Sequence, residues 1–203
     1  RSSKMDEIIA HIEELSKLSP YIKLYRNFDP KIILKHIGKI TGEIDRQYVD
    51  FLLKTNGASI LDYCFLGLKN HSLGVNVYDN MRELWQSDCL LTFRFWGIVG
   101  TSSGENFGYI DEKDSSGNHY IGYYSANEPE HVYLVASSFN IFIDKFLKQV
   151  EASLAIDKNA IYIDNDWFLN PQKLIIDDIE MAQYLQSQET SEYNLLDRKF
   201  DKR

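Results

Sequence analysis

The chain has 203 residues, of which 44% are hydrophobic, 13% aromatic and 26% charged, and its formal net charge is −8. This composition is typical of one globular domain, or of one domain with an appendage, and excludes a largely disordered chain. The acidic excess disfavours nucleic acids and anionic membranes as partners, because phosphate binding rests on clustered Lys and Arg. No apolar stretch approaches the roughly 18 residues that a membrane span requires.

Apolar residues at three- and four-residue steps predict a first helix from Met5 to Leu18. Asp29 and Pro30 predict the start of a second helix, with Asp29 as N-cap and Pro30 in the first helical position. The predicted buried stripe of this second helix consists of Ile32, Ile33, Ile37 and Ile40. A third helix is predicted over residues 45–54, and Asn56-Gly57 favours the left-handed conformation that closes a helix.

Beyond Gly57 the hydrophobic pattern changes to short runs rich in aromatic and branched residues, which are typical of strands. Five strands are predicted, over residues 63–68, 93–99, 107–110, 119–124 and 132–135. A helix over 78–90 separates the first two, and loops over 114–118 and 127–130 join the last three. Ser137 or Ser138 is predicted to cap a closing helix from Phe139 to about Leu154.

The remaining residues differ in composition from the rest of the chain. Residues 151–192 carry nine acids against two lysines, and the chain after residue 188 is polar. We expect a short edge strand over 160–163 and a helix over 172–186, introduced by Asn170-Pro171. Together the elements predict an α+β fold: a mostly antiparallel mixed sheet of about five or six strands, flanked by N-terminal, central and closing helices, with an extra C-terminal helical segment.

The sequence carries no motif for catalysis or metal binding. No two of the five histidines are three or four residues apart, which argues against zinc. Asp164-Asn165-Asp166 lacks the Gly and the closing Glu of a calcium loop, and the glycines over 97–108 precede no Lys-Ser or Lys-Thr of a phosphate-binding loop. Adjacent acids such as Asp177 and Asp178 diverge by about 100° on a helix. We therefore predict no catalytic residues, no metal and no cofactor.

Acidic side chains border the predicted hairpins and the C-terminal helix, and tyrosines lie between the hairpin loops. Such a surface suits a basic protein partner, with tyrosines as anchors and carboxylates for electrostatic steering. The alternative interpretation is an ordinary solvated rim and a solvated helix face. The candidate partner-binding residues are Glu105, Asp111, Glu112, Asp114, Tyr120, Tyr123, Glu128, Glu130, Asp164, Asp166, Asp177 and Asp178.

Cys64 and Cys89 lie within apolar runs and belong to no Cys-x-x-Cys pair, so we expect buried, reduced thiols. The residues before Met5 contain no apolar run of a signal peptide, and we interpret residues 1–4 as a vector remnant. These features predict a cytoplasmic protein, with a leader cleaved earlier left open as an alternative.

Three segments, over residues 40–57, 95–111 and 136–143, resemble the SUKH superfamily in order and spacing. Their helical residues recur at steps of three and four and are expected to fill a core rather than contact a ligand. The motif residues are Tyr48, Phe51, Leu52, Asn56, Gly57, Trp96, Gly97, Gly108, Tyr109, Ser138, Phe139 and Phe142. The chain departs from the family pattern at Ile44-Asp45, where the family usually has a proline.

The superfamily contains fungal cell-wall-synthesis regulators and bacterial immunity proteins that neutralise polymorphic toxins. The resemblance implies a non-catalytic immunity protein that binds a cognate toxin, for example a basic nuclease. The surplus of apolar aromatic residues is compatible with a monomer or a weak homodimer. The alternative is a scaffold or regulator that recruits a cellular protein. The implied organisation is a SUKH-like domain over 5–155, an extension over 156–187 packed on that domain, and a polar tail over 188–203.

Overall fold

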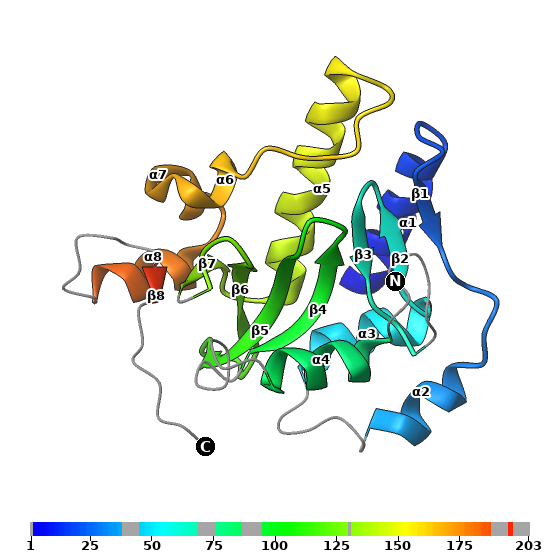
Figure 1. Cartoon of the computed structure of the whole chain (residues 1–203), viewed down its shortest axis with the longest axis horizontal. Coiled ribbons are helices and arrows are strands. Elements are labelled where there is room, and N and C mark those ends of the chain that lie inside the picture. The colour runs from blue at the N-terminus through cyan, green and yellow to red at the C-terminus, as the bar shows by residue number, and fades with distance from the viewer. Residues whose placement is uncertain are drawn as a thin grey trace.

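The structure of the chain is a computed structural model that describes residues 2–37, 45–68, 76–86, 95–129, 131–187 and 195–196. Its strands are β1 (Ile22–Leu24), β2 (Ala58–Ile60), β3 (Tyr63–Phe65), β4 (Trp96–Thr101), β5 (Glu105–Lys113), β6 (His119–Ser125), β7 (Val132–Ala136) and β8 (Leu195–Leu196). Its helices are α1 (Lys4–Ser16), α2 (Pro30–His36), α3 (Arg46–Lys54), α4 (Val77–Gln86), α5 (Phe139–Ile156), α6 (Asp166–Leu169), α7 (Pro171–Leu174) and α8 (Ile179–Gln186) (Figure 1).

Within the described residues the strands form one eight-stranded sheet in chain order, and every neighbouring pair is antiparallel. The predicted α+β class and the mostly antiparallel sheet are therefore confirmed. The strand number is higher than predicted because β1, β2 and β8 have only two or three residues, too few to show an alternating pattern.

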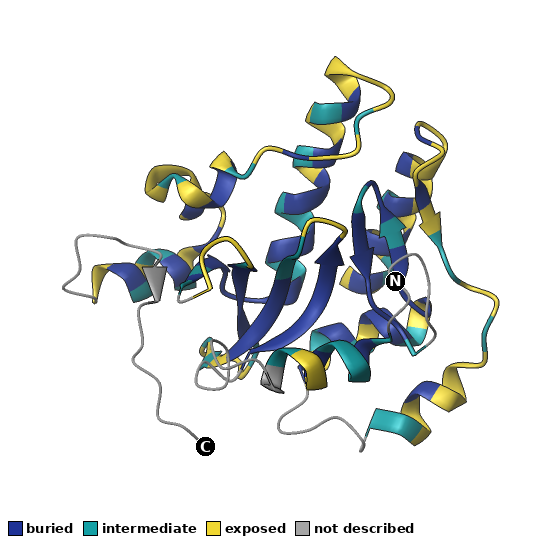
Figure 2. Ribbon diagram, in the orientation of Figure 1, coloured by how far each residue is buried: buried dark blue, intermediate teal, exposed yellow. Residues whose placement is uncertain are grey.

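Helix α5 crosses one face of the sheet, and large aromatic side chains fill the interface (Figure 1). The ring centroids of Phe142 and Phe107 are 5.0 Å apart, and those of Phe146 and Tyr63 are also 5.0 Å apart. Edge-to-face and tilted contacts between aromatic rings stabilise the fold by more than the burial of their apolar area alone. Figure 2 shows that the central strands and the inner side of α5 are buried.

Helix α4 lies against β4 at a glycine. A Cβ added to Gly97 would lie 2.3 Å from Leu84 Cδ1 and 2.6 Å from Asn80 Nδ2, so a side chain at this position would force Leu84 and Asn80 to move. The Asn80 amide donates to the Gly97 carbonyl at 3.1 Å, which fixes α4 to the strand.

Side-chain oxygens cap several helices as the sequence predicts. Asp29 accepts from the Lys31 N–H at 3.0 Å and begins α2, and Ser138 accepts from the Ile141 N–H at 3.3 Å and begins α5. Both predicted caps are confirmed, with Ser138 as the residue chosen over Ser137. At the N-terminus Ser3 caps α1, within the stretch interpreted as a vector remnant.

Two predictions about secondary structure are wrong. Residues 160–163 form no strand; instead the Ile161 carbonyl accepts from the Asp62 N–H at 2.9 Å. The single helix predicted over 172–186 is two helices, α7 and α8, because Asp177 takes a left-handed φ of 56° and Asp178 becomes the N-cap of α8.

The predicted buried stripe of α2 is also partly wrong. Ile33 is 1% exposed, but Ile32 is 48% exposed. Figure 2 shows that most of α2 is exposed or half-buried, because only one narrow side of the helix contacts the body of the protein.

Cys64 is buried, as predicted. Among the described residues, no helix is long and apolar enough to cross a membrane. The predictions for Ile40, Cys89 and Glu130 lie outside the described residues, as does most of the polar tail.

Candidate partner-binding site

The predicted acidic surface is divided between the two ends of the meander formed by β5, β6 and β7. Glu105 begins β5, whereas Asp111 and Glu112 lie near its end. Six residues of extended strand place these groups about 20 Å apart. The acids of the meander loops therefore do not form one ring around the tyrosines.

At the first end, two tyrosine–glutamate pairs lie side by side. The Tyr123 hydroxyl donates to Glu105 Oε1 at 2.7 Å, and the Tyr133 hydroxyl donates to Glu128 Oε2 at 2.7 Å. The two rings are 6.4 Å apart. Tyr123 is buried, and burial together with the hydrogen bond to Glu105 raises its pKa above the ordinary value. Tyr123 therefore positions a carboxylate and does not offer its ring to a partner.

At the second end, Asp114 is used by its own loop. Its carboxylate accepts from the backbone N–H groups of Ser116 and Asn118 at 2.9 and 2.8 Å. Tyr120 is buried and its hydroxyl donates to the Glu180 carbonyl at 3.3 Å. Asp114 thus shapes the loop and Tyr120 joins the hairpin to α8, so both are structural. Asp111 is exposed and Glu112 is half-buried.

The acids of the C-terminal segment separate into exposed and buried groups. Asp164, Asp166 and Asp177 are exposed, and Asp166 forms an ion pair with Lys173. Asp178 is 1% exposed, so its carboxylate is directed inward and is not available to a partner. The acids that sequence reasoning treated as one helix face therefore have different roles.

The segment that carries these exposed acids also exposes large apolar side chains. Of the eleven exposed large hydrophobic residues in the described part of the chain, seven lie between positions 156 and 179. We call these seven residues, with the three exposed acids, the extension surface; the seven are Ile156, Ile161, Tyr162, Leu169, Ile175, Ile176 and Ile179. Exposed apolar side chains concentrated in one segment favour a protein–protein contact there.

The inner side of the same segment belongs to the core. Phe168 and Leu174 are fully buried, and the Phe168 ring is 5.0 Å from Tyr123 and 5.9 Å from Phe107. The buried side chains of Phe168 and Leu174 therefore hold the extension surface in a fixed position on the core. Sequence reasoning missed it because it predicted one continuous helix over 172–186; the acidic pair Asp177-Asp178 within that range was the available signal for a helix break.

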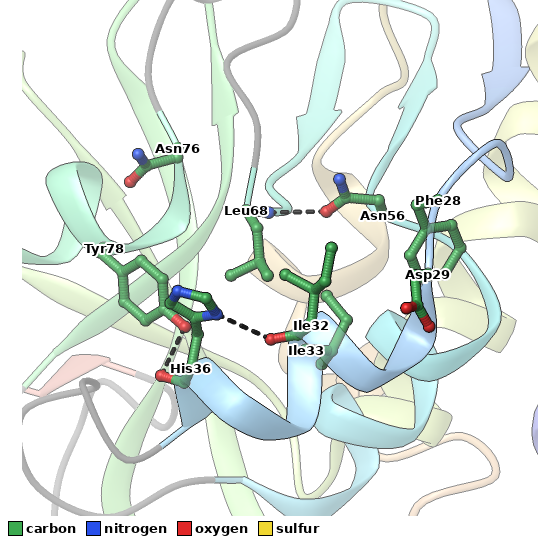
Figure 3. A pocket seen from close by; sticks show the side chains of 9 residues that line it. All are labelled: Phe28, Asp29, Ile32, Ile33, His36, Asn56, Leu68, Asn76 and Tyr78. Carbon is green, nitrogen blue, oxygen red and sulfur yellow. Dashed lines mark hydrogen bonds between the residues drawn. The ribbon is translucent and has the colours of Figure 1, made fainter.

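A separate cavity of about 430 Å³ lies between α2, the end of β3 and the start of α4 (Figure 3). Figure 3 shows apolar walls from Ile32, Ile33 and Leu68 and polar groups at the rim. The His36 Nδ1–H donates to the Ile32 carbonyl at 2.8 Å, and the Tyr78 hydroxyl donates to the His36 carbonyl at 2.7 Å.

This α2 cavity has the character of an apolar side-chain pocket with a few polar groups. Burial raises the pKa of Tyr78 to about 12, so its hydroxyl remains a donor at neutral pH. Asn56 lines the cavity, and its Oδ1 accepts from the Leu68 N–H at 2.7 Å. None of the described partner-binding candidates lines it.

The motif residues hold the core together. The Tyr48 ring is buried and its hydroxyl donates to the carbonyl of Leu66, the residue that follows β3, which ties α3 to the end of that strand. Trp96 and Tyr109 stack with centroids 5.1 Å apart. Gly57 has a φ of 86°, a conformation that suits glycine. The other motif residues are also buried, namely Phe51, Leu52, Asn56, Gly97, Gly108, Ser138, Phe139 and Phe142.

A family model described as the SMI1 / KNR4 family (SUKH-1) matches residues 36–145 of the chain. A search of curated proteins finds no match. The matched range includes all the motif residues and ends within α5, so the extension surface lies outside it.

Proposed function

Because this chain belongs to the SMI1/KNR4 family (SUKH-1), we propose that it is a non-catalytic immunity protein that binds and neutralises a cognate bacterial toxin. The match confirms the family resemblance of the three motifs, and the finer assignment to toxin immunity is our proposal. A toxin of the nuclease class acts inside the cell, so we place the encounter in the cytoplasm. One copy of the chain is sufficient for binding in this proposal.

The observation that carries the proposal is the position of the exposed apolar residues. The extension surface holds seven of the eleven in the described part of the chain, although it lies outside the range that defines the family. A common core with a distinct exposed segment suits proteins that share a fold and bind different partners. We therefore propose that the extension surface makes the central contact with the toxin.

The charge of the chain supports a basic partner. The net charge is −8, and Asp164, Asp166 and Asp177 lie between the exposed apolar residues in the sequence. Carboxylates around an apolar centre accelerate association with a cationic protein, and they can take the place of nucleic-acid phosphates at the groove of a nuclease. The affinity should therefore fall as the salt concentration rises.

The test is co-expression with any toxin encoded beside the gene for this chain, combined with calorimetry of the purified pair at low and high salt. The wild-type chain should restore growth and bind the toxin. The double variant Ile176→Ser/Ile179→Ser should weaken binding at least about a hundredfold, because each isoleucine loses roughly 1.5 kcal/mol or more of apolar contact.

The matched control is Ile32→Ser/Leu34→Ser on α2, since these side chains are 48% and 60% exposed, compared with 56% and 75% for Ile176 and Ile179. It should leave growth rescue and affinity unchanged. Loss of binding in the α2 variant alone would assign the contact to the α2 cavity and contradict our choice of surface. Failure of the wild-type chain to bind or suppress the toxin would contradict the immunity function itself.

The alternative function, recruitment of a cellular protein by a scaffold, makes a different prediction. A pull-down from lysate of the source organism would then yield a housekeeping protein and no toxin. A single basic, toxin-like partner that dissociates at high salt supports the immunity function instead.

A further inference from the structure

A pocket lined by three lysines borders the extension surface of this acidic protein and shares Ile176 and Asp177 with it. Its volume is about 280 Å³, and it is formed where α5 meets the C-terminal segment. The polar side chains that line it are Lys145, Lys148, Gln149, Trp167, Lys173 and Asp177. Among the lining residues there are thus three lysines and one carboxylate, Asp177.

The indole N–H of Trp167 has no hydrogen-bond partner within the part of the chain that the structure describes. Trp167 is 5% exposed, and its Nε1 atom is buried. An indole N–H can only donate, so it requires an acceptor to offset the cost of its burial. Most of the other polar groups that line the pocket are donors as well, which leaves a place for a ligand rich in acceptors.

The lysine at the base of the pocket is poorly solvated. The Lys145 ammonium donates to the Leu174 carbonyl at 2.7 Å, and burial lowers the pKa of Lys145 below its ordinary value. A bound anion would favour the charged form of this side chain. The two outer lysines pair with carboxylates, Lys148 with Asp177 at 3.7 Å and Lys173 with Asp166, and both remain more than half exposed. Because both are exposed, these ammonium groups can turn toward an anion once their ion pairs open.

We propose that this pocket binds a small free oxyanion, a phosphate or a carboxylate, through the indole N–H of Trp167 and the ammonium groups of Lys145 and Lys148. The inference does not depend on the identity of any protein partner. Charge-assisted hydrogen bonds to an oxyanion would satisfy the buried indole and compensate the desolvated lysine together.

The test is NMR titration of the ¹⁵N-labelled full chain with inorganic phosphate, and in parallel with acetate, at constant ionic strength. The Trp167 indole signal, assigned by its loss in Trp167→Phe, should shift and saturate with at least one of the two anions. Lys145→Met should weaken binding about tenfold, because it removes one charged donor. Lys148→Gln, an exposed position that should not disturb folding, should weaken binding in the same direction.

The matched control is Lys158→Gln, an exposed lysine of the same acidic segment that does not line the pocket. It should leave the midpoint of the titration unchanged. Absence of a saturable shift with both anions would overturn the proposal. A loss of affinity in Lys158→Gln equal to that in Lys145→Met would also overturn it, because the effect would then reflect overall charge and not a site.

Discussion

The carboxylate of Asp178 holds Ser137 by two hydrogen bonds. Its Oδ1 accepts from the Ser137 hydroxyl at 2.5 Å, and its Oδ2 accepts from the Ser137 backbone N–H at 2.9 Å. The same Oδ1 accepts from the Met181 N–H at 3.1 Å and caps α8. One buried carboxylate therefore fixes the C-terminal segment to the start of α5, and it determines where the extension surface stands.

Asp178→Asn should lower the free energy of unfolding by about 1–3 kcal/mol, because the amide brings an N–H₂ group against buried donors. Urea denaturation followed by circular dichroism measures the loss. The matched control is Asp177→Asn, whose side chain is 74% exposed and whose replacement should cost at most about 0.5 kcal/mol. Equal losses in the two variants would contradict the tethering role of Asp178.

Phe168→Ala should destabilise the protein by about 3–5 kcal/mol, because the ring is fully buried against Phe107 and Tyr123. The neighbouring Leu169→Ala should have a small effect, since Leu169 is 44% exposed. Thermal and urea unfolding of both variants check this pair. A small loss for Phe168→Ala would mean that the C-terminal segment contributes little to the core.

Asp45 should make stability depend on pH. Burial raises its pKa above 3.8, although hydrogen bonds from the Tyr48 and His119 N–H groups oppose the shift. A carboxyl whose folded pKa is raised contributes most to stability below the unfolded value, and the contribution is lost as the pH rises through the folded value.

The unfolding free energy of the wild type minus that of Asp45→Asn should therefore decrease as the pH rises above 3.8 and then level off. Taking the difference removes the titration of the other carboxyls, which both proteins share. Urea denaturation over a pH series measures it. A difference that grows with pH would contradict the prediction.

Gly108→Ala should destabilise the protein more than Gly97→Ala. A Cβ at position 108 would lie 2.4 Å from the Trp96 backbone oxygen, whereas one at position 97 would meet the side-chain ends of Leu84 and Asn80. Side chains can rotate away and a paired strand cannot, so we expect losses of about 3 kcal/mol for Gly108→Ala and about 1 kcal/mol for Gly97→Ala. Thermal unfolding ranks the stabilities of the two variants. A larger loss for Gly97→Ala would contradict the prediction, because α4 would then yield less than the strand backbone at Trp96.

The local features of this protein can be predicted from the sequence. The helix caps at Asp29 and Ser138 are hydrogen bonds between one side chain and a backbone N–H within the next three residues, so a short stretch of sequence is enough to predict them. The closing helix shows a strong helical period, and strands β5, β6 and β7 are runs rich in aromatic and branched residues. The motif residues predict both the family and the α+β class. Short strands such as β1 have no such period and were missed.

The candidate site depends on contacts between distant segments, and only the tertiary structure decides them. Asp178 is buried because Ser137, 41 positions earlier, supplies donors for its carboxylate, and this contact breaks the expected helix and turns Ile179 outward. Trp167 and Lys145 lie in different helices, and packing brings them to one pocket. A sequence pattern records which faces of an element are apolar. The packing of the whole chain then decides which of these faces contacts another segment and which remains exposed for a partner.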